Sequence, residues 1–395
     1  MEVSIKDDYV NPKTNTTYNF TKALERPELK KSVIIVTVIL FLCAGTTTIT
    51  LSKMMYNTTT FGRKSELHPF EHPMFLTFMM FVGMAICIVV HIIVNLVFPE
   101  QQPKHVLVNM RSPFRLEVFL AMIVPAFCDF LGGYLMNVGL LYVTSSVFQM
   151  MRGSVILFTA LLAVFVRKVK LLPNQVFSLF LVIVALAIVG GSAFAGGRNL
   201  IRGESKVWDV VVGITFITGA MFLQATQTIL EEKYLLDLKI PPLVVVGLEG
   251  FYGVFMSLPG MVILQLLPAP FYDDSIDAVV SLREKYILVI VVFYVMAITV
   301  FNIAGMIITQ NLSAMVRNIL DPCRMITIWM VSVILYYSTG KSMGEPLGWQ
   351  TCLQVLGFVM LTSGLFIYTG VWKMNIFGKD KENEVFMSKD DDLFE

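Results

Sequence analysis

The feature that most constrains this chain is a series of apolar runs, each long enough to cross a bilayer as a helix. A hydrocarbon core of roughly 30 Å needs about 20 helical residues. Because 56% of the residues are hydrophobic and only 15% charged, we expect an all-α polytopic membrane protein rather than a soluble one. The ten runs cover 32–52, 74–98, 117–141, 144–166, 173–195, 207–231, 242–267, 285–309, 312–337 and 346–372.

The runs form two groups of five with the same internal layout. The connections after the third and eighth runs, near 142–144 and 309–312, are very short. After each, a serine leads to an arginine and then to an apolar stretch. Repeats with an odd number of spans lie in opposite orientations. We therefore predict ten transmembrane helices in two inverted five-helix repeats, 32–195 and 207–372, and expect the two short hairpins to close one gate. Two unrelated five-helix stretches are the alternative.

The basic residues near the membrane indicate the orientation of the chain. Roughly 15 Lys and Arg lie on the side of the amino terminus and about nine on the other side. The positive-inside rule then places both termini in the cytosol. We expect a cytosolic tail over 1–31 and a cytosolic acidic tail over 373–395.

Six charged residues lie inside the apolar runs, where each costs about 2.5–3.5 kcal/mol on insertion scales. Three acids balance three bases, as expected for internally paired buried charges. Two interpretations stay open: static ion pairs between helices, or a cavity that binds an anionic or zwitterionic solute. The six are Asp129, Glu249, Asp321, Arg152, Arg317 and Arg324.

Helical spacing groups several of these side chains. Arg317, Asp321 and Arg324 follow at intervals of four and three residues, so they share one helix face. Gln149 and Arg152, three residues apart, form a similar polar stripe. Pro322 removes one main-chain hydrogen bond, so we predict a kink or a hinge beside Asp321.

Several classes of function lack support in the sequence. The net charge of +1 argues against nucleic acid as a partner. No hydrolase motif, phosphate loop or paired Cys motif is present, so we expect no enzyme, no catalytic residue and no cofactor. We also predict no metal site, because a lone histidine such as His91 has no second ligand at suitable spacing.

Four segments resemble the F-type members of solute carrier family 35, in the drug/metabolite transporter superfamily. They are SSVFQMMRGSVILFTALL (145–162), ILEEKYL (229–235), VGLEGFYG (246–253) and FNIAGMIITQNLSAMVRNILDPCRMITIW (301–329). The resemblance covers about 116–370. It implies ten helices, alternating access and an endomembrane location. The signature positions are Gln149, Arg152, Glu249, Asn302, Arg317, Asp321 and Arg324. The Pro322-Cys323 pair departs from the small-residue pattern, and the Gly-Ala-Leu-Asn-Lys signature of GDP-sugar transporters is absent.

We predict a secondary-type transporter of a small polar metabolite, anionic or zwitterionic, in an endomembrane such as that of the lysosome, Golgi or mitochondrion. Its partners are a small-molecule solute and the lipid bilayer; a homodimer is left open. A non-transporting membrane scaffold or complex subunit with a carrier fold is the alternative. The predicted solute ligands are Gln149, Arg152, Asn302 and Arg324. The predicted charge network or coupling residues are Asp129, Glu249, Arg317 and Asp321.

Overall fold

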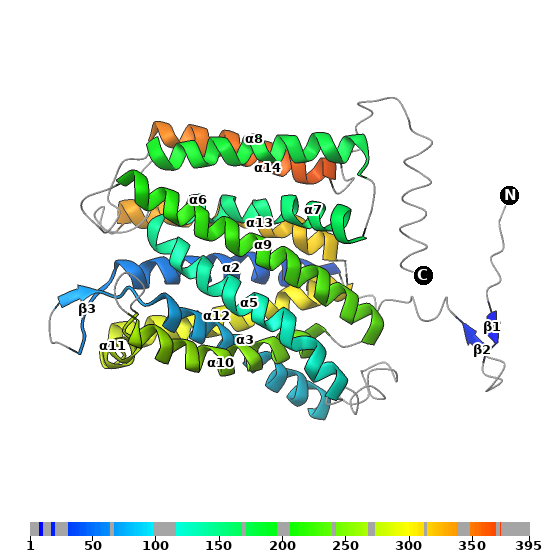
Figure 1. Ribbon diagram of the computed structural model, residues 1–395, viewed down its shortest axis with the longest axis horizontal. Helices are drawn as coiled ribbons and strands as arrows, with labels where there is room; N and C mark the ends of the chain where they lie inside the picture. The colour runs from blue at the N-terminus through cyan, green and yellow to red at the C-terminus, as the bar shows by residue number, and fades with distance from the viewer. Residues whose placement is uncertain are drawn as a thin grey trace.

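The computed structural model confirms an all-α polytopic membrane protein (Figure 1). The structure describes residues 8–10, 17–19, 31–63, 67–97, 116–167, 171–195, 206–238, 242–267, 273–311, 314–338, 348–368 and 372. The predicted tail over 373–395 lies outside these residues, and so does most of the tail over 1–31. Within the latter, β1 (Asp8–Val10) pairs antiparallel with β2 (Thr17–Asn19), which the sequence analysis did not anticipate.

The first half of the chain forms the expected helices, with small differences at their ends. They are α2 (Lys31–Asn57), α3 (Pro73–Val97), α5 (Leu116–Tyr142), α6 (Ser145–Met151), the 3₁₀ turn η2 (Arg152–Ser154), α7 (Val155–Arg167) and α8 (Pro173–Ala195). Pro73 and Pro173 each begin a helix, where the missing N–H breaks no hydrogen bond. The fourth predicted span is thus interrupted by a tighter turn at Arg152.

The second half follows the same order and adds one short helix. Its members are α9 (Lys206–Leu238), α10 (Pro242–Leu266), α11 (Ser275–Ser281), α12 (Lys285–Asn311), α13 (Ala314–Ser338) and α14 (Trp349–Tyr368). The sequence analysis did not predict α11, which lies between α10 and α12. Among the described residues, nine helices are long and apolar enough to span a membrane. The apolar part of α13, Cys323–Ser338, is shorter than these nine helices. The count of ten spans therefore stays a prediction.

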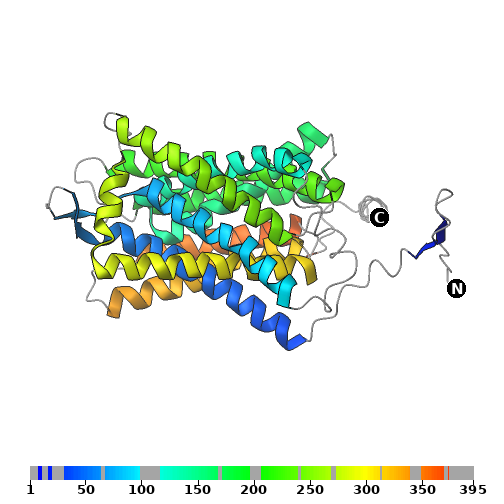
Figure 2. The same cartoon turned by 90° about the horizontal axis from the view of Figure 1, so that it is seen from below.

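The helices pack in pairs that join the two halves. Figure 1 shows α8 beside α14 at one side of the bundle and α3 with α10 at the other. Between them α5 packs against α9, and α2 packs against α12. Figure 2 shows the same bundle from a perpendicular direction, with its long helices running broadly along one axis. Residues from the two halves therefore meet throughout the interior.

Close packing and exposed apolar side chains account for this arrangement. A Cβ at Gly250 of α10 would lie 2.2 Å from the backbone nitrogen of Ala85 in α3, so glycine permits this approach. On α12, every fourth side chain from Leu288 to Val300 is exposed and apolar, as expected for a helix that faces lipid. The four side chains are Leu288, Val292, Met296 and Val300.

The two short hairpins lie at opposite ends of the bundle, so the expectation that they close one gate is wrong. The hairpin after α5 lies beside the end of α2, where Lys53 donates a hydrogen bond to the carbonyl of Val143 (2.8 Å). That end also holds β3 (Thr59–Phe61), β4 (Leu67–Pro69) and α11. We call it the strand end. α12 begins there and runs for 27 residues, about 40 Å at 1.5 Å per residue, before its own hairpin.

Candidate functional site

Three charged side chains meet where α6 and η2 lie against α13. The Asp321 carboxylate pairs with Arg324 through Oδ1, and its Oδ2 lies 3.6 Å from Nη2 of Arg152. We call Arg152, Asp321 and Arg324 the central charge cluster. Gln149 joins it, because its Nε2 donates to the Asp321 carbonyl oxygen at 3.0 Å. Four of the predicted site residues, from both halves of the chain, are therefore in contact.

Local helix geometry places these groups. Thr144 caps α6 by accepting a hydrogen bond from the Val147 N–H (3.4 Å), which fixes the start of the helix. Seven residues later the chain tightens into η2, which begins at Arg152. A 3₁₀ turn within a longer helical run often marks a functional hinge. On α13, Asp321 and Arg324 are three residues apart and share one face, as predicted.

The structure places Arg324 between aromatic rings that the sequence analysis did not single out. Its Cζ lies 4.5 Å from the ring centroid of Phe301 and 5.7 Å from that of Phe41. The two rings are stacked with centroids 4.7 Å apart. A Cβ at Gly45 of α2 would lie 2.1 Å from Nη1 of Arg324. The carboxylate and the two π faces compensate in part for burial of this charge.

Exposure differs sharply within the central charge cluster. The Arg324 side chain is 2% exposed, whereas those of Arg152 and Asp321 are 16% and 28% exposed. Asp321 and Arg152 are therefore the more accessible members of the cluster. In the present conformation Arg324 is closed off.

Positive charge exceeds negative charge at this site. Arg317 lies one helical turn before Asp321 on α13. Its guanidinium packs near Gly305, where a Cβ would lie 3.2 Å from Nε. Within the central charge cluster, the two guanidinium groups and one carboxylate have a formal excess of one positive charge. An anion would be attracted to such a site.

The other predicted residues occupy neighbouring positions. Asn302 is buried on α12, and its Nδ2 donates to the Ile298 carbonyl of the same helix at 2.9 Å. Glu249 is buried on α10 and accepts from Nε2 of Gln227 in α9 at 3.3 Å. Asp129 is half-buried on α5, which packs against α9 and α10. Assignment of Asp129, Glu249 and Arg317 to a charge network stays a prediction.

Pro322 lies within α13, which is helical on both sides of it. The helix continues through this position, and the kink and the hinge role both stay predictions. The side chain of Pro322 lies outside what the structure describes.

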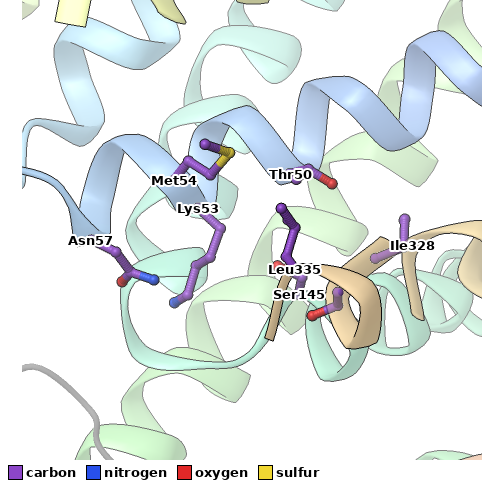
Figure 3. A pocket seen from close by; sticks show the side chains of 8 residues that line it. Thr50, Lys53, Met54, Asn57, Ser145, Ile328 and Leu335 are labelled. Carbon is purple, nitrogen blue, oxygen red and sulfur yellow. The ribbon is translucent and has the colours of Figure 1, made fainter. Parts of the chain in front are cut away.

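A small, partly open hollow lies near the strand end (Figure 3). It is lined by Thr50, Lys53, Met54, Asn57, Ser145, Ile328, Ser332 and Leu335. Ser145 is one helical turn from Gln149, and Ile328 is one turn from Arg324, so both neighbour the central charge cluster along their helices. The hollow therefore ends close to the cluster.

Lys53 bounds this hollow and ties two helices together. Its Nζ donates to the carbonyl oxygens of Leu140 (2.7 Å), in the last turn of α5, and Val143 (2.8 Å), just after this helix. The last carbonyls of a helix lack intrahelical partners and attract a cation. Lys53 therefore holds the hairpin between α5 and α6 against α2.

The chain is similar in sequence to known membrane transport proteins. Residues 32–235 match a family model described as purine nucleobase transmembrane transport. Solute carrier family 35 member F6 of Rattus norvegicus is 31% identical over 325 residues, covering 78% of this chain and 80% of that protein. An uncharacterized protein of Schizosaccharomyces pombe is 34% identical over 272 residues, covering 66% and 76%. One crystal structure has a TM-score of 0.45 at 14% identity and covers 87% of this chain and 98% of that chain.

Helices that span a membrane and these relatives define an integral membrane protein of the transmembrane transporter class. The chain belongs to the solute carrier family 35 group that contains member F6, which confirms the resemblance seen in its motifs.

Proposed function

We propose that this protein is a secondary-type transporter that moves a small polar metabolite by alternating access. The observation that carries the proposal is the central charge cluster, which joins η2 of the first half to α13 of the second. Sites between two repeats near the middle of the membrane are typical of secondary transporters. Transporter relatives indicate a role other than catalysis.

The helix pairing supports two inverted five-helix repeats. A twofold relation would match α2 with α9, α3 with α10 and α5 with α12. The contact between α5 and α9 would then correspond to the contact between α12 and α2, and both contacts are present. The pairs α3 with α10 and α8 with α14 are unchanged by this relation. Contacts of α13 with α2 likewise correspond to those of α7 with α9. This correspondence is what a twofold relation between the halves 32–195 and 207–372 would produce.

The proposed solute carries an anionic group, alone or in a zwitterion. Arg152 is partly exposed, so it contacts the anionic group first. Arg324 binds the anionic group when the site opens. Asp321 orients both arginines, while Gln149 and Asn302 donate hydrogen bonds. Entry of an anion releases Asp321 from one arginine, which links binding to movement of η2 against α13.

The proposed orientation places both termini in the cytosol and the strand end in the lumen of an endomembrane compartment. The excess of basic residues on the amino-terminal side supports it. Lysosome, Golgi and mitochondrion remain the candidate locations.

A scaffold or complex subunit with a carrier fold is the second candidate. The observation that favours it is Arg324, which is paired with Asp321 and only 2% exposed, as in a sealed interior. The two candidates differ in whether purified protein alone moves a solute.

Uptake by proteoliposomes containing only this protein tests the proposal. The panel includes organic anions, amino acids, nucleotide sugars and, because of the matching family description, purine nucleobases. Saturable uptake of at least one anionic or zwitterionic compound, above that of empty liposomes, is expected. A scaffold would give uptake equal to empty liposomes for the whole panel.

A further inference from the structure

Four ionisable side chains meet at the strand end, far from the central charge cluster. His68 lies on β4, His72 precedes α3, and Asp273 and Asp277 come from the segment that contains α11. Nε2 of His68 lies 2.7 Å from Oδ2 of Asp277, and Nε2 of His72 lies 3.2 Å from the same oxygen. Segments about 200 residues apart in the sequence thus converge on one carboxylate oxygen.

His72 faces a carboxylate at each ring nitrogen. Its Nδ1 lies 3.1 Å from Oδ1 of Asp273, while its Nε2 faces Asp277. A neutral imidazole has one N–H, so it supplies a hydrogen to only one of these contacts. The other nitrogen needs either a second proton or a cation between it and the carboxylate. The Asp273 contact at Nδ1 is the arrangement that orients a metal-bound histidine.

The surrounding structure holds these groups in place. The side chains of His72, Asp273 and Asp277 are 7%, 4% and 9% exposed, whereas that of His68 is 35% exposed and provides access from solvent. Asp273 Oδ2 accepts from the Met74 N–H (2.9 Å), and Asp277 Oδ1 accepts from the Arg63 N–H (2.5 Å). Both carboxylates are therefore fixed by main-chain donors.

Two further contacts shape this pocket. A Cβ at Gly62 would lie 2.0 Å from Oδ1 of Asp277, so only glycine allows the β3–β4 connection to approach. The ring of Phe70 packs edge-on against His72, with centroids 4.9 Å apart.

We propose that His68, His72 and Asp277 bind a divalent transition metal ion, Zn²⁺, with Asp273 orienting His72 through Nδ1. The three ligand atoms lie within 4.8 Å of one another. Bonds of about 2.0 Å in a tetrahedron separate ligand atoms by roughly 3.3 Å, which is near the 3.2 Å between His72 and Asp277. His68 lies 2.7 Å from the same oxygen, so it must move back by about 0.6 Å to match.

The donor set favours zinc over the common hard cations. Two imidazoles and one carboxylate suit Zn²⁺, whereas Mg²⁺ and Ca²⁺ prefer oxygen ligands. Three protein ligands leave a fourth position for water, and the partial exposure of His68 makes that position reachable. Bound zinc would tie the β3–β4 hairpin and the start of α3 to α11. This proposal is independent of whether the protein transports a solute.

Zinc titration of the full-length protein, purified in detergent and freed of metal with a chelator, tests the site. Competition with a chromophoric zinc indicator should show one ion per chain. His72→Ala and Asp277→Asn should weaken binding at least tenfold, whereas His91→Ala should leave it unchanged, because His91 lies about 28 Å along α3 from His72 at 1.5 Å per residue. Binding that persists in the first pair, or no stoichiometric binding to the wild type, would overturn the proposal.

A measurement on the wild type covers the case in which those variants fail to fold. Cobalt, a spectroscopic substitute for zinc, should give the intense visible bands of a four-coordinate N/O site. In parallel, zinc should protect His68 and His72, but not His91, from diethylpyrocarbonate, as read by mass spectrometry. Weak six-coordinate bands, together with histidines that zinc leaves unprotected, would refute the metal site.

Discussion

The guanidinium of Arg324 lies over the ring of Phe301, with 4.5 Å between Cζ and the ring centroid. This contact joins α13 to α12, and Phe301 in turn stacks on Phe41 of α2. A buried arginine with one carboxylate partner thus depends on aromatic faces from two further helices. Removing a face should therefore cost stability even where the ion pair with Asp321 is kept.

Phe301→Leu should lower the stability of the folded protein by about 1–2 kcal/mol, because a desolvated cation–π contact has roughly this magnitude. Thermal unfolding in detergent measures the change. Phe293→Leu is the matched control, since Phe293 lies on the same helix with 57% exposure. Equal unfolding temperatures for the two variants would show that the Phe301 ring does not stabilise Arg324.

Gly45→Ala should displace Arg324 and destabilise the protein by about 1–3 kcal/mol through overpacking. The added methyl would lie 2.1 Å from Nη1 of Arg324. Thermal unfolding and solute uptake should both decline. Gly191→Ala, where no atom lies within 4 Å of the added Cβ, serves as the control. Wild-type stability and uptake in Gly45→Ala would contradict the described packing.

Gly250→Ala should separate α10 from α3, because its Cβ would lie 2.2 Å from the Ala85 backbone nitrogen. Backbone atoms yield less readily than a side-chain end, so we expect a loss of about 1–3 kcal/mol or failure to fold. Gly219→Ala, whose nearest neighbour is 4.0 Å away, is the comparison. Detergent size-exclusion profiles and unfolding temperatures report the result; indistinguishable profiles would count against close packing here.

Lys53→Met should loosen the hairpin between α5 and α6, because it removes the donors to Leu140 and Val143. A cysteine placed by Ser145→Cys, in the adjoining hollow, should then react faster with a membrane-impermeant maleimide. The five native cysteines are first replaced. Lys285→Met alters an exposed lysine elsewhere and should not change the rate. An unchanged labelling rate in Lys53→Met would show that Lys53 does not hold the hairpin against α2.

Helical spacing and the high cost of buried charge were enough to single out four side chains that the structure brings into contact. Gln149 and Arg152 fall on one stripe, Asp321 and Arg324 on another, and the structure brings the two stripes together. Periodicity could not identify Phe41, Gly45 or Phe301, because aromatic and small residues occur throughout apolar helices and only packing distinguishes these three. The partners of the acidic residues were harder still to predict, because spacing within one helix does not show which helix packs against it.

The strand end shows a different limit of sequence reasoning. His68 and His72 are near each other in the chain, but Asp273 and Asp277 follow about 200 residues later. Ligand spacing within one segment could not reveal a cluster formed by two distant connections. The hairpin error has a similar origin: two connections equivalent in sequence were expected on one side, whereas the structure places them at opposite ends of the bundle.

The most direct test of the proposed transport site is uptake of the solute identified in the panel by Arg152→Gln in proteoliposomes. Arg152 is preferable to Arg324 because its partial exposure makes misfolding less of a concern. Uptake should fall at least tenfold in this variant, with partial recovery in Arg152→Lys, while the exposed Arg283→Gln behaves as wild type. Wild-type uptake by correctly folded Arg152→Gln would contradict a solute site at the central charge cluster.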